Sequence, residues 1–366
     1  MKPKYMNRRV LISGGGTGGH IYPAISIANE FKKRNEKYEI LFVGAKGRME
    51  MKKVPKNGYK IKGIWITGIN RRNIFSNILF PFKLIISLIQ SFFIVIKFNP
   101  DIAIGTGGFA SGPALIISHF FNKPIFLQEQ NSFPGITNKI LAKYAKNIFV
   151  AYENMDKFFP ENKILNFGNP IRNRLFNIKS KDIEAFKKNN EIKNNKTILF
   201  LGGSLGAKVM NDYVFNNENY FIENNYQVIL QCGERYQENY LNKSTSLIKV
   251  IPFIDDMHLA FSCSDLIVSR SGAIIISELS NLGKPVIFIP SPNVAEDHQT
   301  KNAKYLYEIE AAELVHEDEI DYKLNSIIKK IFADEKLKEK YSKNLKKISN
   351  NNSTELIVDQ IENYIV

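Results

Sequence analysis

The apolar positions at the start of the chain form short runs that alternate with longer amphipathic stretches. Residues 9–12 and 39–43 are apolar runs of strand length, and residues 24–34 between them place apolar side chains at helical spacing. This order is typical of a βαβ unit, so we predict a parallel sheet. Further strands are predicted at residues 101–105, 124–131 and 147–151.

The same alternation starts again in the second half of the chain. Apolar runs predict strands at residues 196–201, 227–231, 247–251, 265–269 and 285–289, with helical patterns between them. The turn-forming sequence Gly168-Asn169-Pro170 separates the two halves. A length of 366 residues allows two ordinary domains. We therefore predict an α/β protein with two Rossmann-like, doubly wound parallel-sheet domains, 1–170 and 171–352, and a closing amphipathic helix, 353–366, that packs back on the first domain.

A glycine-rich turn follows the first predicted strand. Gly14, Gly16 and Gly19 match the dinucleotide fingerprint, and they precede a helix whose bare N–H groups and dipole favour an anion. The fingerprint also requires a carboxylate at the end of the second strand to hold a ribose. Because that strand runs into Gly44-Ala45-Lys46, a nicotinamide or flavin cofactor is disfavoured.

His20 is the titratable side chain at the end of this turn. An imidazole has an unperturbed pKa near ~6.5, so it could act as a general base. The alternative is a histidine that only caps backbone groups.

Three more glycine turns, at residues 105–112, 202–207 and 270–273, repeat the pattern without the lysine of a P-loop. They indicate a diphosphate held by backbone amides and hydroxyls, such as that of Ser204. Glu278, in the helix after the last of these turns, could accept both hydroxyls of a ribose, although its position alone favours a solvated helix residue.

Residues 74–98 are the most apolar segment of the chain. Its longest uncharged run, 84–96, is shorter than the ~20 residues of a membrane span. Two interpretations stay open. One is a helix buried against the sheet, and the other is a surface segment that touches a bilayer, with Arg71, Arg72, Lys83 and Lys97 among anionic headgroups.

The amino-acid composition says little about the functional class of the protein. A net charge of +14 suggests an anionic partner, but a Lys-rich composition along the whole chain explains the excess equally well. Cys232 and Cys263 suggest neither a disulfide framework nor a metal site, which fits the reducing cytoplasm, and the five histidines lack metal-ligand spacing.

An ordered set of motifs along the chain carries a resemblance. The motifs are Gly15-Gly16-Thr17-Gly18-Gly19-His20, Met49-Glu50, Gly105-Thr106-Gly107-Gly108, Glu129-Gln130-Asn131, Pro134-Gly135, Gly168-Asn169-Pro170, Gly202-Gly203-Ser204, Phe253-Ile254-Asp255-Asp256-Met257, Arg270-Ser271-Gly272-Ala273, Ser277-Glu278 and Asp297-His298-Gln299. With them the chain resembles glycosyltransferase family 28, the bacterial GT-B enzymes that transfer N-acetylglucosamine from UDP to lipid I.

The resemblance implies two Rossmann-like domains with the active site in the cleft between them. It implies an inverting reaction in which the muramoyl 4-hydroxyl of lipid I attacks the sugar and lipid II forms. It implies His20 as the general base and Glu129 as the alternative base. The residues that it implies for UDP-N-acetylglucosamine are Thr17, Gly18, Gly19, Asn131, Arg172, Ser204, Ile254, Ala273, Ile274, Ile275, Ile276, Ser277, Glu278 and Gln299.

We expect no required cofactor, no metal site formed by the protein's own residues and no nucleic-acid partner, and whether a divalent ion assists the reaction stays open. The resemblance places the protein peripherally on the cytoplasmic face of the inner membrane, with residues 74–98 on an anionic surface. Phe109, Leu205 and Gln128 depart from the usual Tyr, Gln and His of the family, which affects acceptor contacts more than the type of reaction.

Two rival functions stay open. A diacylglycerol glycosyltransferase would share the nucleotide half but should lack the run from Glu129 to Asn138. A non-catalytic UDP-sugar sensor at the membrane would not need His20 for its function.

Overall fold

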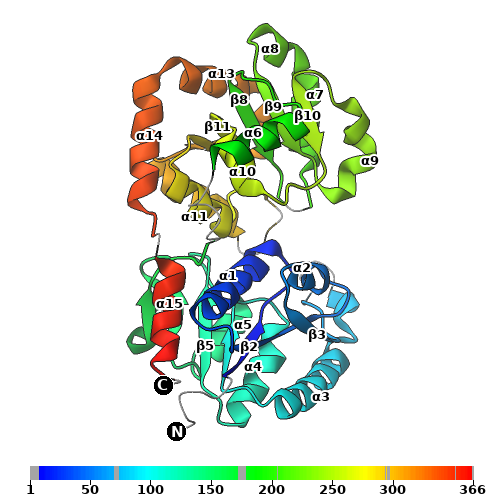
Figure 1. The fold of residues 1–366 in the computed structure, drawn as a ribbon, viewed down its shortest axis with the longest axis vertical. Helices are drawn as coiled ribbons and strands as arrows, with labels where there is room; N and C mark the ends of the chain where they lie inside the picture. Colours follow the sequence, from blue (N-terminus) through cyan, green and yellow to red (C-terminus); the bar gives the residue numbers. More distant parts are fainter. Residues whose placement is uncertain are drawn as a thin grey trace. The chain divides into compact units, whose positions relative to one another are not determined.

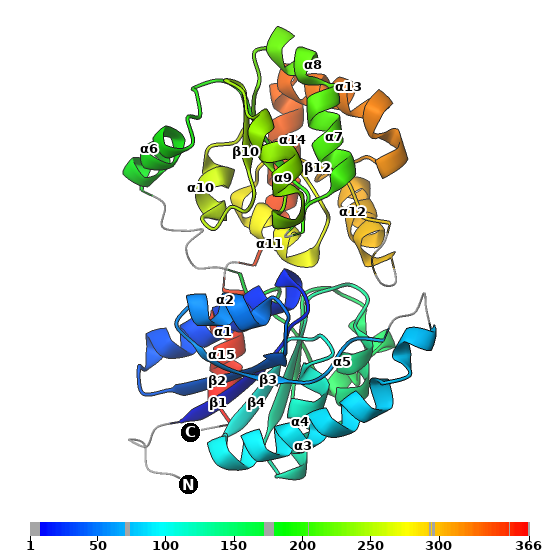
Figure 2. The ribbon, with the colours of Figure 1, turned by 90° about the vertical axis from the view of Figure 1, so that its right-hand side faces the viewer.

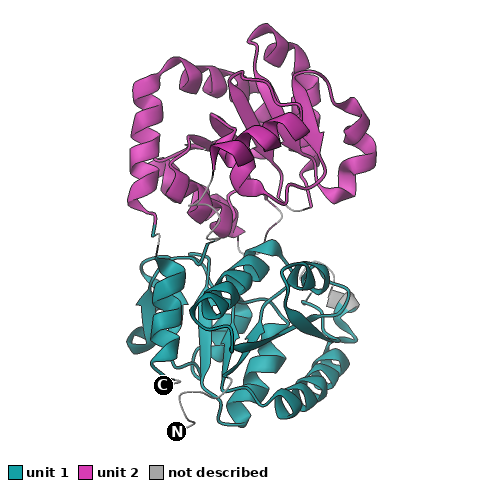
Figure 3. Cartoon of the chain, in the orientation of Figure 1, with its two compact units in different colours: residues 1–172, 350–366 teal, residues 173–349 magenta. Residues whose placement is uncertain are grey.

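The computed structural model describes residues 8–69, 74–171, 179–203, 205–292, 294, 297–350 and 352–364. The chain divides into two compact units, which Figure 3 colours separately. Unit 1 comprises residues 1–172 and 350–366, and unit 2 comprises residues 173–349.

Unit 1 is built on a seven-stranded sheet in the order β3-β2-β1-β4-β5-β6-β7, and all of its strand pairs are parallel. The strands are β1 (Arg9–Ser13), β2 (Glu39–Ala45), β3 (Lys60–Ile64), β4 (Ile102–Gly105), β5 (Ile125–Glu129), β6 (Ile148–Val150) and β7 (Ile164–Asn166). The helices are α1 (Gly18–Arg34), α2 (Glu50–Lys56), α3 (Phe80–Phe98), α4 (Ser111–Phe120), α5 (Ile136–Leu141) and α15 (Ser353–Glu362).

Helices cover both faces of this sheet, as Figure 2 shows. Strand β1 explains why, because Val10 and Ile12 join the apolar cluster on the α1 and α15 side, whereas Leu11 joins the cluster on the α4 and α5 side. A strand buried on both faces is a continuous apolar run, which is the pattern of residues 10–12.

The last helix, α15, packs on α1 (Figure 1). Arg34 at the end of α1 pairs with Asp359 at 2.6 Å and with Glu362 at 2.8 Å. Tyr38 donates a hydrogen bond to Glu362, and burial together with this bond raises the pKa of its phenol. The C-terminal segment therefore completes the unit in which the chain begins.

Unit 2 contains a parallel six-stranded sheet in the order β10-β9-β8-β11-β12-β13. The strands are β8 (Thr197–Leu201), β9 (Gln227–Gln231), β10 (Ile248–Ile251), β11 (Leu266–Ser269), β12 (Val286–Phe288) and β13 (Glu313–Leu314). The helices are α6 (Ser180–Asn189), α7 (Lys208–Asn216), α8 (Glu218–Glu223), α9 (Gln237–Tyr240), α10 (Met257–Ser262), α11 (Ala273–Leu282), α12 (His298–Glu308), α13 (Ile320–Ala333) and α14 (Glu335–Lys347). The predicted parallel α/β class is confirmed in both units.

Helix α3 contradicts one of the two interpretations of residues 74–98, the buried helix, and leaves the surface segment open. It is a 19-residue helix, long and apolar enough by length and composition to cross a membrane, so the judgement that the segment is too short is wrong. Only 17% of its apolar window is buried, so the interpretation as a buried helix is wrong as well. Its buried residues are Ser87, Ser91 and Val95, one stripe of mostly small side chains that lets the helix approach its neighbours. Leu84, Ile94 and Phe98 pack beside this stripe, whereas other large apolar residues face outward.

Candidate functional site

The first glycine turn joins β1 to α1 in unit 1. Gly16 has φ +86°, a conformation that favours glycine, and Thr17 in extended conformation precedes the first helical residue, Gly18. Thr17 and Gly19 are exposed, and Gly18 is half-buried. The turn therefore presents the first turn of α1 to solvent.

His20 is held at the start of α1 by its ring and by its backbone. Its Nδ1 lies 2.9 Å from the carbonyl oxygen of Gly15, and its own carbonyl accepts a hydrogen bond from the Thr106 hydroxyl at 2.8 Å. Because a carbonyl oxygen only accepts, Nδ1 carries the hydrogen in the neutral ring and Nε2 carries the lone pair. This tautomer is the one that lets Nε2 act as a base.

The second glycine turn, after β4, makes room for this ring. Gly107 has φ +93°, and a Cβ at this position would lie 3.1 Å from Nε2 of His20. Behind it, Gln130 donates to the Thr106 carbonyl at 2.7 Å, and Asn169 donates to the Gln130 carbonyl at 3.1 Å. A buried polar network thus supports the residue that holds the His20 backbone.

Glu50, at the start of α2, lies against the first glycine turn. Its side chain is fully buried, and its carboxylate accepts hydrogen bonds from Gly16 N–H at 3.0 Å and from Ala45 N–H at 2.9 Å. The sequence shows no acid at the end of β2, but the fold brings this one to the same place from the next helix. The sequence predicts no role for Glu50 beyond its place in a motif, since a contact between α2 and the first turn leaves no local signal.

Glu129 ends β5 and is 2% exposed. One of its carboxylate oxygens accepts from the backbone and side-chain nitrogens of Asn131 at 3.0 and 3.2 Å. The other accepts from Gly135 N–H at 3.2 Å and from the Asn138 amide at 2.9 Å. Four donors hold the carboxylate in place and order the loop of residues 131–135. This geometry suits an organising residue better than a proton acceptor.

The first glycine turn of unit 2 follows β8. Gly203 has φ +87°, and a Cβ there would meet no atom within 4 Å, whereas Gly206, with φ +78°, packs against the carbonyl of Cys232. Burial raises the pKa of the Cys232 thiol, so this cysteine stays protonated and does not suit a nucleophilic role.

Gln231, at the end of β9, connects two candidate donor-binding loops. Its amide nitrogen donates to the Gly203 carbonyl at 3.1 Å, and its amide oxygen accepts from Ile254 N–H at 3.0 Å. Ile254 is 3% exposed. The backbone of Ile254 is thereby placed beside the glycine turn.

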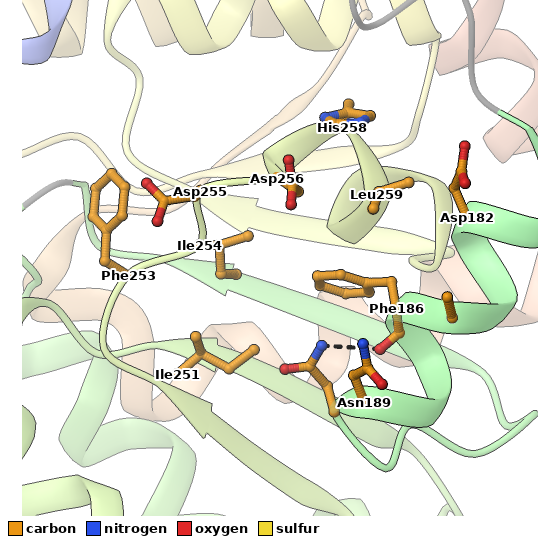
Figure 4. A pocket seen from close by; sticks show the side chains of 12 residues that line it. Asp182, Phe186, Asn189, Ile251, Phe253, Ile254, Asp255, Asp256, His258 and Leu259 are labelled. Carbon is orange, nitrogen blue, oxygen red and sulfur yellow. Dashed lines mark hydrogen bonds between the residues drawn. The ribbon is translucent and has the colours of Figure 1, made fainter. Parts of the chain in front are cut away.

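Beside Ile254 lies a cavity of about 770 Å³ between α6 and the segment from β10 to α10 (Figure 4). Ile251, Ile254, Phe186 and Leu259 form its apolar walls, and polar residues including Asp182 stand around them. Six of the twelve residues that line this cavity are polar or charged, so it is more polar than the usual small-molecule pocket.

Helix α11 begins after β11 with Gly272 as its N-cap residue, and a Cβ on Gly272 would meet no atom within 4 Å. Open backbone at a helix N-terminus accepts anionic groups. Ser277 is half-buried and its hydroxyl donates to the Ala273 carbonyl at 3.0 Å. Glu278 is 2% exposed, so its interpretation as a solvated helix residue is wrong. Residues 273, 274 and 276 are buried, and residue 275 is half-buried.

Gln299 ties together two loops at the strand ends. Its side-chain oxygen accepts from Ser291 N–H at 2.9 Å, and its carbonyl accepts from the Ser271 hydroxyl at 2.8 Å. It therefore lies between the loop after β12 and the start of α11. Two candidate residues, Arg172 and Ser204, lie outside the described residues.

Comparison with known proteins identifies the family. The model of the glycosyltransferase family 28 N-terminal domain matches residues 10–150, and that of the glycosyltransferase family 28 C-terminal domain matches residues 197–361. A UDP-N-acetylglucosamine–N-acetylmuramyl-(pentapeptide) pyrophosphoryl-undecaprenol N-acetylglucosamine transferase from Flavobacterium psychrophilum is 48% identical over 96% of both chains. The enzyme of the same name from Christiangramia forsetii is 47% identical over 98% of both chains.

Solved structures agree with this assignment. Acinetobacter baumannii MurG matches with a TM-score of 0.73 and 26% identity, over 97% of this chain and 99% of that one. The kitacinnamycin glycosyltransferase matches with a TM-score of 0.73 at 14% identity, over 99% of this chain and all of that one, which shows a shared fold.

Proposed function

Because the chain belongs to glycosyltransferase family 28, we propose that unit 2 holds its sugar donor and that His20 of unit 1 activates its acceptor. The protein is an N-acetylglucosaminyltransferase. It transfers N-acetylglucosamine from UDP-N-acetylglucosamine to undecaprenyl-pyrophosphoryl-N-acetylmuramoyl-pentapeptide, lipid I, and forms lipid II.

The proposed chemistry is a single displacement. Nε2 of His20 takes the proton of the muramoyl 4-hydroxyl as its oxygen bonds to C1 of the donor sugar. The bond from C1 to the phosphate oxygen breaks on the opposite side, UDP leaves with the electron pair, and the anomeric centre inverts. The hydrogen bond from His20 Nδ1 to Gly15 supports this role, because it leaves the lone pair on Nε2.

The leaving diphosphate needs positive potential that is already in place. We assign this task to the start of α11, residues 273–276, where open backbone at Gly272 and the helix dipole favour negative charge. Glu278 is assigned to the ribose hydroxyls, Ile254 to uracil through its backbone, Ser277 to the diphosphate region and Gln299 to the sugar. Ile254 N–H would have to exchange Gln231 for the base.

Six further residues are proposed to contact the donor. Four of them lie in the described part of unit 1, and the other two, Arg172 and Ser204, lie outside the described residues. The four are Thr17, Gly18, Gly19 and Asn131. The donors around Glu129 argue against the alternative in which it serves as the base. No step of this chemistry calls for a cofactor, since UDP-N-acetylglucosamine is a substrate.

Transfer of labelled N-acetylglucosamine from UDP to a lipid I analogue tests the function. We expect labelled lipid II that is β-1,4 linked and no transfer to diacylglycerol. Product on diacylglycerol alone would favour the lipid glycosyltransferase, and UDP binding with no transfer to either acceptor would favour the sensor.

We also propose that unit 1 contacts the cytoplasmic face of the inner membrane peripherally through α3. Phe82, Ile85, Ile89 and Phe93 are each more than half exposed. The same helix packs on α4 and β3, elements of the folded unit, so it fits a surface contact better than a span. Lys83 and Lys97 at its two ends provide charge for anionic headgroups.

Charged substitutions on α3 test this contact. Ile85→Asp combined with Phe92→Asp should abolish most sedimentation with phosphatidylglycerol vesicles, because both side chains are exposed on α3. Ile222→Asp, at a similarly exposed position on α8 of unit 2, is the matched control and should sediment normally. Equal sedimentation of all three proteins would exclude α3 as the membrane contact.

A further inference from the structure

Glu50 and His20 are bonded to opposite ends of one peptide group. The Glu50 carboxylate accepts from Gly16 N–H at 3.0 Å, and His20 Nδ1 donates to Gly15 C=O at 2.9 Å. The Gly15 carbonyl and the Gly16 N–H belong to the same amide. The order of groups is therefore carboxylate, peptide, imidazole.

We propose that the Gly15–Gly16 peptide transmits the negative charge of Glu50 to His20, which makes Glu50 a positioning residue for the base. This inference rests on the proposed role of His20. A carboxylate that accepts from an amide N–H polarises the amide and makes its carbonyl oxygen a stronger acceptor. That oxygen then orients the imidazole and stabilises the imidazolium that forms when Nε2 takes a proton, as the carboxylate does in a catalytic triad.

Burial makes this arrangement effective. Glu50 is fully buried, so water screens its charge little. Its second oxygen accepts from Ala45 N–H at 2.9 Å, which fixes the carboxylate between the end of β2 and the glycine turn. The carboxylate has little freedom to turn away from the peptide.

Two glycines make room for the Glu50 side chain, and a third donates the hydrogen bond to it. A Cβ on Gly15 would overlap the Glu50 carboxylate, and a Cβ on Gly44 would lie 2.5 Å from Glu50 Cγ. Gly16, with φ +86°, turns its N–H toward the carboxylate in a conformation that few other residues adopt. The glycines of this turn therefore serve an internal carboxylate at Gly16 N–H, where the fingerprint would place a phosphate.

Other charged groups lie farther from this turn than Glu50 does. The Arg48 guanidinium lies 6.0 Å from the centre of the Phe109 ring, whose edge lies beside Gly16. Glu129, on β5, is bonded to Asn138, whose amide lies near Gly107. The charged residues of the neighbouring β2 end and of α2 are Lys46, Lys52, Lys53 and Lys56. Of the bonds described for this turn, only that of Glu50 joins a carboxylate to the peptide that His20 contacts.

The test is a histidine NMR titration of the full chain, with the His20 signals assigned by their loss in His20→Gln. In the wild type we expect the Nδ1–H tautomer. In Glu50→Gln we expect the His20 pKa to fall by roughly one unit, because a nearby negative charge favours the protonated ring. The acid limb of kcat/KM should move by the same amount, and kcat should fall about tenfold.

The control is Glu30→Gln, which removes another buried carboxylate, bonded to Lys33 and Arg34 on α1. It should change thermal stability but leave the His20 pKa in place. An unchanged His20 pKa in folded Glu50→Gln would overturn the proposal. If that variant does not fold, an Nε2–H tautomer in the wild type would overturn it equally.

These outcomes separate the relay from the function itself. Wild-type transfer with an unmoved His20 pKa would reject only the relay. A wild type that makes no lipid II would reject the function, while the titration would still show whether the relay exists.

Discussion

The glycine turn after the first strand of unit 1 and the glycine turns after β8 and β11 of unit 2 have opposite surroundings. In unit 1, Gly16 N–H is occupied by the buried carboxylate of Glu50. In unit 2, a Cβ on Gly203 or on Gly272 would meet no atom within 4 Å. The protein itself occupies the turn of unit 1 at Gly16 N–H, whereas Gly203 and Gly272 leave backbone open to a ligand.

This difference shows that a glycine-rich turn before a helix does not by itself identify a phosphate site. The turn of unit 1 uses its glycines to admit a carboxylate and to direct a carbonyl toward His20. The turns of unit 2 retain the free approach that a diphosphate needs. We assign the proton transfer to the first and the nucleotide to the second.

Removal of the proposed base of unit 1 should have the largest effect, a loss of catalysis without a loss of UDP binding. His20→Ala should lower kcat by about 10³-fold, the usual contribution of a general base, and leave the Kd of UDP within about twofold. Steady-state transfer rates and calorimetry with UDP measure the two quantities. His119→Ala, which removes another unit 1 histidine, whose ring contacts Tyr144, is the control and should be active. Full activity of His20→Ala would contradict the assignment of the base.

Removal of the buried acid of unit 2 should affect binding instead. Glu278→Ala should weaken UDP binding about tenfold, since a charge-assisted hydrogen bond contributes about 1.5 kcal/mol or more. Calorimetry with UDP checks this value. Glu313→Ala removes a buried acid of the same unit that is bonded to Lys330 and Tyr341, and it should lower stability without changing UDP affinity. Equal UDP affinity in wild type and Glu278→Ala would remove Glu278 from the site.

A methyl group at Gly272, in the open turn before α11, should have a smaller effect on UDP binding. Gly272→Ala should leave the melting temperature nearly unchanged, because its φ of −69° suits alanine and the methyl group meets no neighbour. It should weaken UDP binding about threefold if phosphate approaches this backbone. Thermal melting and UDP titration check the two expectations.

The matched substitution on a closed glycine is Gly206→Ala. Its φ of +78° and the Cys232 carbonyl leave no room for a methyl group, so it should lose about 2 kcal/mol or more of stability. Unchanged UDP affinity in Gly272→Ala would place the diphosphate elsewhere.

The sequence predicted the fold well because burial on both faces leaves a direct pattern. Strands such as Val10–Ile12 are continuous apolar runs, and each parallel sheet follows from their alternation with helices. The sequence also indicates His20 as a candidate base, since it lies within a local motif, and this role stays a prediction.

Contacts between distant elements could not be predicted in this way. Glu50 approaches Gly16 from another helix, so no local spacing signals the contact. The burial of Glu278 likewise depends on how α11 packs in its unit. By contrast, the small residues Ser87 and Ser91, one helical turn apart, are a local signal for the face of α3 that packs on the unit.

The most direct test of the division between the two units is the single-turnover rate of transfer to lipid I, measured against donor concentration. Saturating UDP-N-acetylglucosamine should restore the rate of Glu278→Ala to near the wild-type value, because only donor binding is impaired. The rate of His20→Ala should stay about 10³-fold low at every donor concentration. Recovery of His20→Ala at high donor concentration, or a low plateau for Glu278→Ala, would contradict the account.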